Sequence, residues 1–177
     1  MKIIKIFLAS SVVEFQKERQ ELMAFVNRLN NICVKKGVYF ELEICEGLSN
    51  AVAAKRKQNE YNEYIRNSEY FFLLFGRSAG TYTIEEYDVA MDQFKAKGAP
   101  KIYIYFKQLP QGEKEEKSVS DFRERIEKES EIVSGGFVCI EDVKRDLLKV
   151  LSQDARVNGV LTGQDGQAFW DGYLILS

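Results

Sequence analysis

The sequence predicts an α/β fold in which helices cover both faces of a parallel, doubly wound sheet of five strands. The strongest indication is Tyr70–Phe75, a run of six apolar residues without polar alternation. Such a run is typical of a central parallel strand that is buried on both faces. The second indication is that strand-like and helix-like segments alternate along the chain with short connections, as they do in doubly wound folds.

The chain opens with a predicted strand at Lys2–Leu8, and a long helix is expected from about Val12 to Lys36. Apolar residues recur through this helix at helical spacing. Ser11 and Glu14 have the spacing of a capping box at its start, and Gly37 is a natural stop.

A second strand is predicted at Val38–Cys45, where Glu41 and Glu43 interrupt the apolar residues on one side. This alternation indicates an edge strand. Residues 46–57 have no clear apolar period and predict a loop. A short helix through Tyr61 then leads into the central strand.

The turn after the central strand contains Gly76 and Gly80, so its backbone is able to approach a ligand closely. Thr83 and Glu86 have the spacing of another capping box, which predicts a helix that begins near Thr83. On a helical projection Glu86 lies on the flank that faces the sheet edge, whereas Glu85 faces water.

The second half of the chain continues the alternation of strands and helices. The predicted elements are a strand at Lys101–Phe106, a helix from Ser120 to about Val133 that Gly135 and Gly136 end, a strand at Phe137–Ile140 and a helix at Val143–Leu151. Five strands with four intervening helices fit the flavodoxin-like strand order 2-1-3-4-5. Residues 1–152 are predicted to form this domain. Residues 153–177 are predicted to be an added hairpin or the start of a neighbouring domain.

Composition excludes several functions. The chain has 177 residues, a net charge of -2 and a pI of about 5.5, so it has no general attraction to nucleic acid or anionic membranes. No apolar run reaches the roughly 20 residues that span a bilayer, and we expect a soluble, cytoplasmic protein. Cys33, Cys45 and Cys139 are scattered, which favours reduced core thiols over disulfides or a zinc site.

The chain contains no histidine. It therefore lacks a Ser-His-Asp or Cys-His triad and an H-E-x-x-H metal site. We expect no metal site and no bound cofactor. Any catalysis has to rely on carboxylates, hydroxyls, lysines, thiols or backbone groups.

A ligand site is expected beyond the carboxyl ends of strands one and three, because the winding of the sheet reverses there. The candidate residues are Glu86 as the catalytic group, with Ala9, Ser10, Ser11, Gly76, Arg77 and Ser78 at the two strand ends. Structural interpretations stay open: Glu86 as a capping-box partner, the serines as helix caps, and the tyrosines around this segment as core residues. Lys55–Lys57 is either a solvated loop or a phosphate clamp.

Four pieces occur in a characteristic order: the opening strand IFLASS, the loop that begins at Glu46-Gly47, the segment IRNSEYFFLLF and the segment TIEEYDVA. Together they resemble a Toll/interleukin-1 receptor (TIR) domain over about residues 3–150. The resemblance is to the divergent bacterial TIR-like domains found at the N-terminus of antiphage defence proteins.

In that family a helix of the form W-C-x-x-E, followed by an alanine four positions on, supplies the glutamate needed for NAD hydrolysis or cyclisation. Glu86 and Ala90 take these places here, and Tyr82 and Thr83 replace the Trp-Cys pair. The resemblance implies that NAD is the substrate, that the product is ADP-ribose or a cyclic isomer, and that Gly47 and Tyr82 line the NAD site. It also implies TIR–TIR homo-oligomers and a sensor domain in a longer chain.

The residues present suit this chemistry. Nicotinamide leaves NAD as a neutral ring, so its departure needs no general acid and the lack of histidine is no handicap. An ionised carboxylate near the ribose stabilises its oxocarbenium-like transition state. In the first turn of a helix, such a carboxylate is favoured by the helix dipole, whereas burial opposes its charge.

Two other functions stay open. A nucleoside deoxyribosyltransferase-like enzyme shares this sheet and attacks an N-glycosidic bond with a glutamate after a Gly-rich turn. A non-catalytic TIR module works only by self-association, and Glu86 is then a helix cap.

Overall fold

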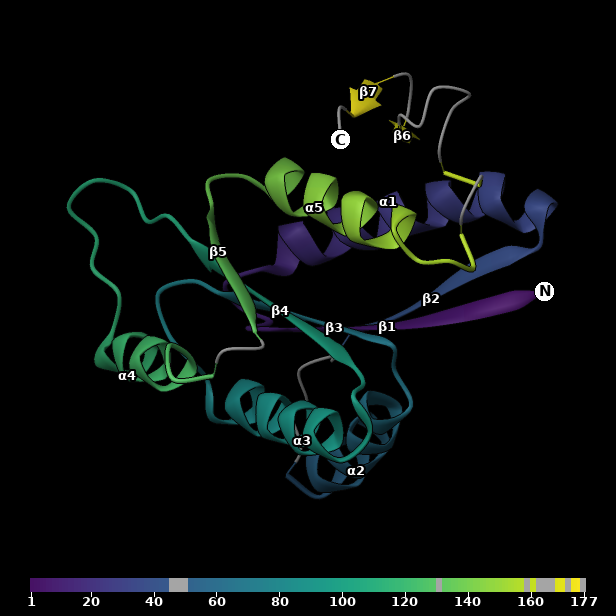
Figure 1. Cartoon of the computed structure of the whole chain (residues 1–177). Helices are drawn as coiled ribbons and strands as arrows, with labels where there is room; N and C mark the ends of the chain where they lie inside the picture. The colour runs from purple at the N-terminus through teal and green to yellow at the C-terminus, as the bar shows by residue number, and fades with distance from the viewer. Residues whose placement is uncertain (45–50, 130–131, 158–159, 162–167, 171–172, 176–177) are drawn as a thin grey trace.

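The computed structural model describes residues 1–44, 51–129, 132–157, 160–161, 168–170 and 173–175. Five parallel strands form one sheet in the order β2-β1-β3-β4-β5, which confirms the predicted order (Figure 1). The strands are β1 (Lys2–Ser10), β2 (Val38–Ile44), β3 (Tyr70–Phe75), β4 (Lys101–Lys107) and β5 (Val133–Phe137). The predicted edge strand β2 does lie at an edge.

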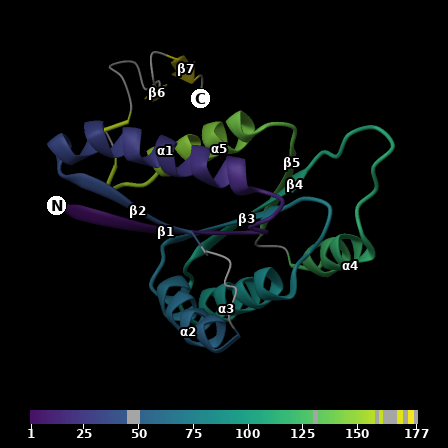
Figure 2. The same ribbon diagram turned by 180° about the vertical axis from the view of Figure 1, so that it is seen from behind.

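Helices cover both faces of this sheet. They are α1 (Gln16–Cys33), α2 (Ala51–Arg66), α3 (Thr81–Lys97), α4 (Lys117–Ile126) and α5 (Ile140–Ser152). Helices α1 and α5 lie on one face, and α2, α3 and α4 lie on the other, as the views from front and back show (Figures 1 and 2). No helix in the described ranges is long and apolar enough to cross a membrane.

Two short elements lie outside this arrangement. A 3-10 helix, η1 (Val34–Lys36), follows α1 and ends at Gly37, whose φ of 79° is left-handed, so the predicted stop at this glycine is confirmed. Near the C-terminus, β6 (Ala168–Trp170) and β7 (Tyr173–Ile175) pair antiparallel. This pairing matches the hairpin interpretation of the tail.

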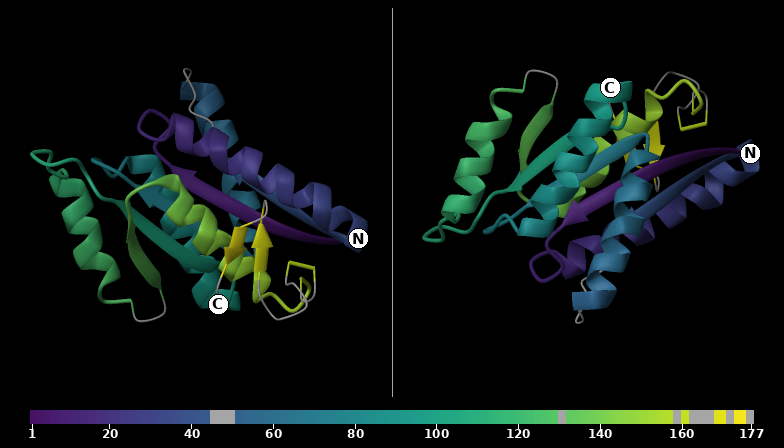
Figure 3. Two further views of the ribbon diagram at one scale, coloured as in Figure 1. Left: turned by 90° about the horizontal axis from the view of Figure 1, so that it is seen from above. Right: turned by 90° about the horizontal axis from the view of Figure 1, so that it is seen from below.

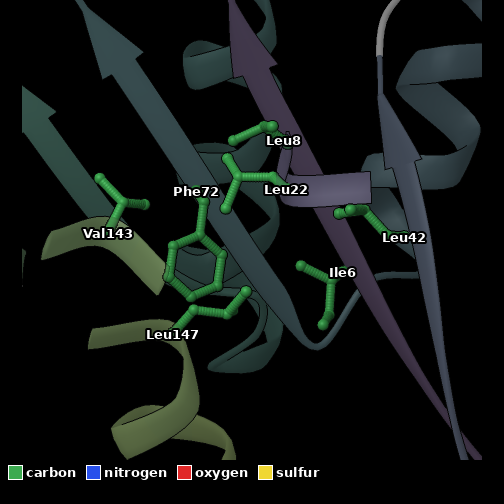
Figure 4. Close-up of a pocket in the computed structure, with 7 residues that line it drawn as sticks. All are labelled: Ile6, Leu8, Leu22, Leu42, Phe72, Val143 and Leu147. Carbon is green, nitrogen blue, oxygen red and sulfur yellow. The ribbon is translucent and has the colours of Figure 1, made fainter. Parts of the chain in front are cut away.

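The side chains of the strands alternate between two core layers. In β1, Ile6 and Leu8 pack toward α1 and α5, whereas Phe7 and Ala9 pack toward α2, α3 and α4. All six residues of β3 are buried, as its unbroken apolar sequence predicts. A cavity of about 10 Å³ in the first layer is lined only by apolar side chains (Figure 4). A cavity so small and apolar is a packing gap and not a ligand site.

Helix α2 begins at Ala51, so the predicted loop over residues 46–57 is wrong for residues 51–57. Ala, Lys, Arg and Gln dominate the first half of α2. These residues have high helix propensity, which outweighs the missing apolar period. Residues 45–50 lie outside the described part of the chain.

The elements after β4 begin and end elsewhere than predicted. Helix α4 starts at Lys117, not Ser120, and it ends at Ile126. Gly135 and Gly136 do not end this helix; they lie inside β5, because their backbone pairs with β4. Strand β5 therefore covers Val133–Phe137 instead of Phe137–Ile140.

Helix α5 starts at Ile140 instead of Val143. Its start is fixed by the Asp142 carboxylate, which accepts hydrogen bonds from the backbone N–H groups of Val138 and Cys139 at 3.0 and 3.2 Å. Cys139 is consequently exposed at the helix N-cap, which corrects its assignment to the core, whereas Cys33 is buried as expected.

Candidate functional site

The winding of the sheet reverses between β1 and β3. The chain leaves β1 for α1 on one face and leaves β3 for α3 on the other, and the views from above and below show the two helices on opposite sides (Figure 3). Strands β1 and β3 are hydrogen-bonded neighbours, with Ser10 aligned with Leu74. The two loops that follow them therefore meet at one edge of the sheet, where α/β proteins bind ligands.

Glu86 is buried at this edge, and only 1% of it is exposed. It shares the inward side of α3 with Thr83, Tyr87 and Ala90, which are also buried, whereas Glu85 is exposed. The predicted orientation of the two glutamates is thus confirmed. Tyr87 and Ala90 pack in the layer that contains Phe7 and Ala9, so Glu86 and the predicted site residue Ala9 belong to the same side of the sheet.

The predicted capping box is wrong. Helix α3 begins at Thr81 with Gly80 as the N-cap, and no side chain caps it. Glu86 is therefore in the second turn, and the first turn contains no acidic residue. A role as a cap is excluded, and the helix dipole contributes little because its effect falls off within the first turn.

A buried carboxylate costs free energy. A titratable group in such surroundings is a candidate functional residue. Next to Glu86, burial first and the Glu129 carboxylate second raise the pKa of Tyr87 to about 12, so this phenol is neutral at physiological pH. Its hydroxyl is buried and makes no hydrogen bond among the described residues.

The serines at the end of β1 have separate roles. The Ser10 side chain lies on the α1 face, because Leu8, two residues earlier in the strand, packs there and side chains alternate along a strand. Its hydroxyl is buried and makes no hydrogen bond within the described ranges, while its carbonyl accepts one from Arg19 Nη1 at 3.3 Å. The Ser11 hydroxyl accepts the Glu14 backbone N–H at 3.3 Å, but α1 begins only at Gln16, so neither Ser11 nor Glu14 caps it.

Glu14 is the site residue that sequence reasoning missed. Its Oε2 accepts the Arg77 backbone N–H at 2.6 Å, and its Oε1 accepts the Ser78 backbone N–H at 3.1 Å and the Ser78 hydroxyl. Glu14 thus joins the loop after β1 to the loop after β3. The capping-box spacing drew attention to Glu14, but it gave no sign of a partner 63 residues away.

Gly76 is needed for this close approach. A Cβ at Gly76 would lie 2.2 Å from Glu14 Oε2 and 3.1 Å from the Phe15 ring. Gly76, Arg77 and Ser78 therefore do lie together at the predicted edge of the sheet, but they contact a carboxylate of the chain itself.

The other candidates are exposed, lie in the core or fall outside the described residues. The side chains of Arg77 and Tyr82 are exposed, and 60% of Tyr82 is accessible. Gly47 lies outside the described residues, and so do the side chains of Lys55–Lys57 in α2. Tyr61 and Tyr70 are core residues. Among the described residues, no cluster of three His, Cys, Asp or Glu side chains is placed to hold a metal ion.

Comparison with known proteins places the chain by fold and family. The structure resembles that of a CMP N-glycosidase, BcmB, from Clostridium botulinum, with a TM-score of 0.51 and 13% sequence identity over 81% of this chain and 97% of that one. At this identity the likeness concerns the fold. No curated protein matches the sequence. The family model that matches is not a TIR model, and the TIR resemblance stays a prediction. Because the model described as "Domain of unknown function (DUF4062)" matches residues 5–152, the chain belongs to that family.

Proposed function

We propose that this protein cleaves the N-glycosidic bond of a nucleotide and that NAD, cut at the nicotinamide bond, is its substrate. The observation that carries the proposal is the burial of Glu86 at the edge of the sheet where the winding reverses. The carboxylate lies in the second turn of an uncapped helix, so helix capping does not account for it. A role in a reaction explains the buried carboxyl group of Glu86 better.

In the proposed reaction the bond between C1′ of the ribose and the nicotinamide nitrogen breaks. The bonding electrons leave with the ring, which starts as a cation and departs neutral. Water then adds its oxygen to C1′ and releases a proton to solvent, which gives ADP-ribose. Attack by a nitrogen of the adenine gives a cyclic isomer instead. Glu86 stabilises the positive charge that develops on the ribose, directly or through its hydroxyl groups.

A second candidate is an N-glycosidase that acts on nucleoside monophosphates. The fold likeness to a CMP N-glycosidase supports it. The chemical demands differ, because the base of an ordinary nucleotide is uncharged before cleavage and has to receive a proton as it leaves. With no histidine in the chain, that proton would have to come from a carboxyl or another side chain. We therefore place NAD first.

The test is a substrate panel with the purified chain at high protein concentration. NAD, CMP and a deoxynucleoside mixed with a free base are incubated separately, and the products are separated by chromatography. We expect nicotinamide from NAD. Cytosine released from CMP, with NAD intact, would replace the first proposal with the second. Base exchange on the deoxynucleoside would favour a deoxyribosyltransferase. No turnover of any substrate would favour a self-association module.

We also propose, from the resemblance to bacterial defence domains, that the enzyme works in antiphage defence as a homo-oligomer in which a neighbouring copy completes the pocket. The rate of NAD cleavage per molecule is then expected to rise with protein concentration. A constant specific activity across a hundredfold dilution would contradict the shared pocket, although not the cleavage itself.

A further inference from the structure

The loop Gly76–Ser78 has the properties of an anion-binding site. Two successive backbone N–H groups, of Arg77 and Ser78, and the Ser78 hydroxyl all donate to one carboxylate. Successive N–H groups that converge in this way form an anion-binding site, and both phosphate and carboxylate present the negatively charged oxygens that such a site accepts. The missing side chain at Gly76 leaves the space in which the anion lies.

Two further groups, the Arg77 side chain of this loop and the Ser10 hydroxyl at the end of the neighbouring strand β1, make no hydrogen bond to Glu14. The Arg77 side chain is exposed, and within the described ranges its guanidinium makes no hydrogen bond or ion pair. Ser10 is buried, with 5% of the residue exposed, and its hydroxyl makes no hydrogen bond within the described ranges. Ser10 aligns with Leu74, so it lies on the same face of the sheet as Gly76. A buried hydroxyl without a partner is uncommon, and a ligand that extends from the loop to the end of β1 would supply one.

We propose that the loop Gly76–Ser78 is a phosphate site, that the Glu14 carboxylate occupies it in the free protein, and that a phosphate group of the substrate displaces Glu14. The identity of this phosphate as part of a nucleotide rests on the proposed function, whereas the phosphate site itself does not depend on that function.

The energetic consequence is competition. A ligand that binds only the open loop has its apparent dissociation constant raised by the inverse of the fraction of molecules in which Glu14 has left. Since charge-assisted hydrogen bonds hold Glu14 in place, that fraction is small. Removing the carboxylate then strengthens phosphate binding by about tenfold or more.

The experiment measures binding of inorganic phosphate by calorimetry to the wild type, Glu14→Ala and Glu14→Gln. Glu85→Ala is the matched control, because it removes one negative charge from an exposed position. We expect Glu14→Ala to bind phosphate about tenfold more tightly than the wild type and Glu85→Ala to behave as the wild type. Adding Ser78→Ala to Glu14→Ala is expected to remove most of the gain, because it deletes one of the three donors.

Equal phosphate affinity in the wild type and Glu14→Ala would overturn the proposal and leave Glu14 as a structural link between two loops. An equal gain in Glu85→Ala would also overturn it, because the effect would then be one of net charge. If Glu14→Ala does not fold, Glu14→Gln decides the question, since it keeps the shape of the side chain and loses its charge.

The same measurement separates this inference from the proposed function, since phosphate binding needs no turnover. A gain in phosphate affinity in a protein that leaves NAD and CMP intact would retain the site and reject the enzyme. Cleavage of NAD without any gain in phosphate affinity would retain the proposed enzyme and reject the phosphate site. A further arm with 5′-AMP and adenosine tests whether the phosphate of a nucleotide is recognised: only 5′-AMP is expected to gain affinity from Glu14→Ala.

Discussion

Asn30 on α1 completes the hydrogen bonding of Phe40 on the edge strand β2. Its Nδ2 donates to the Phe40 carbonyl at 2.8 Å, and its Oδ1 accepts the Phe40 backbone N–H at 2.7 Å. Both residues are buried, so the amide takes the place that a neighbouring strand would take. This is one way in which a protein covers a sheet edge.

Replacing this amide should destabilise the fold. In Asn30→Ala both Phe40 backbone groups lose their partner in a buried setting, and we expect the free energy of unfolding to fall by about 2–4 kcal/mol. Urea unfolding measures it. Asn31→Ala, at an exposed neighbouring position, should change stability by less than about 0.5 kcal/mol. Equal effects of the two substitutions would mean that the edge is not held by Asn30.

Asp154 should make stability depend on pH in the acid range. Its carboxylate accepts hydrogen bonds from Arg156 Nε and Nη2 at 2.9 and 2.7 Å and from the Tyr70 hydroxyl at 2.8 Å. The Arg156 side chain is the largest cause that holds the pKa of Asp154 well below its usual value of 3.8. A carboxyl whose pKa is lower in the folded state adds stability above its unfolded pKa and loses it as pH falls.

We therefore expect the free energy of unfolding to fall as pH drops below about 4, and to fall less steeply in Asp154→Asn. At pH 7 that variant should be less stable than the wild type. Thermal unfolding measured at a series of pH values from about 7 down to about 2, a range that includes the ordinary aspartate pKa of 3.8, provides the measurement. Asp121→Asn, at an exposed position on α4, serves as the control. Parallel pH profiles of the wild type and Asp154→Asn would exclude Asp154 as a source of acid sensitivity.

Any side chain at Gly76 should lower the stability of the fold. In Gly76→Ala the new methyl group meets Glu14 Oε2 and the Phe15 ring. The glutamate is able to move away, but Phe15 is fully buried, and crowding of this kind costs about 1–3 kcal/mol. Gly135→Ala is the matched control, because nothing lies within 4 Å of a Cβ there. Equal unfolding midpoints in denaturant would show that the two loops adapt freely.

The sheet order and the direction of Glu86 were predictable because they depend on patterns that many residues share. The unbroken apolar run of β3 requires cover on both faces, and the side of α3 that Glu86 occupies follows from the spacing of its apolar neighbours. Neither inference depends on where α3 begins, so both are correct although the predicted start of α3 is two residues too late.

Local motifs were less informative, because a tertiary contact outweighs them. Ser11 with Glu14 and Thr83 with Glu86 both have capping-box spacing, yet neither glutamate caps a helix. Glu14 gains more from three donors on a distant loop than from a single N–H nearby. Only the three-dimensional structure places those donors beside it, so its role was not accessible to sequence reasoning.

Glu86 is the residue on which the proposed glycosidic cleavage depends. The most direct test is the rate of nicotinamide release from NAD by Glu86→Gln and Glu85→Gln at one high protein concentration, with folding checked by circular dichroism. Glu86→Gln replaces the buried carboxyl group with a neutral amide and should lower the rate by about 100-fold or more, whereas Glu85→Gln, which changes the exposed neighbour, should keep the wild-type rate. Cleavage of NAD by folded Glu86→Gln at the wild-type rate would contradict the account.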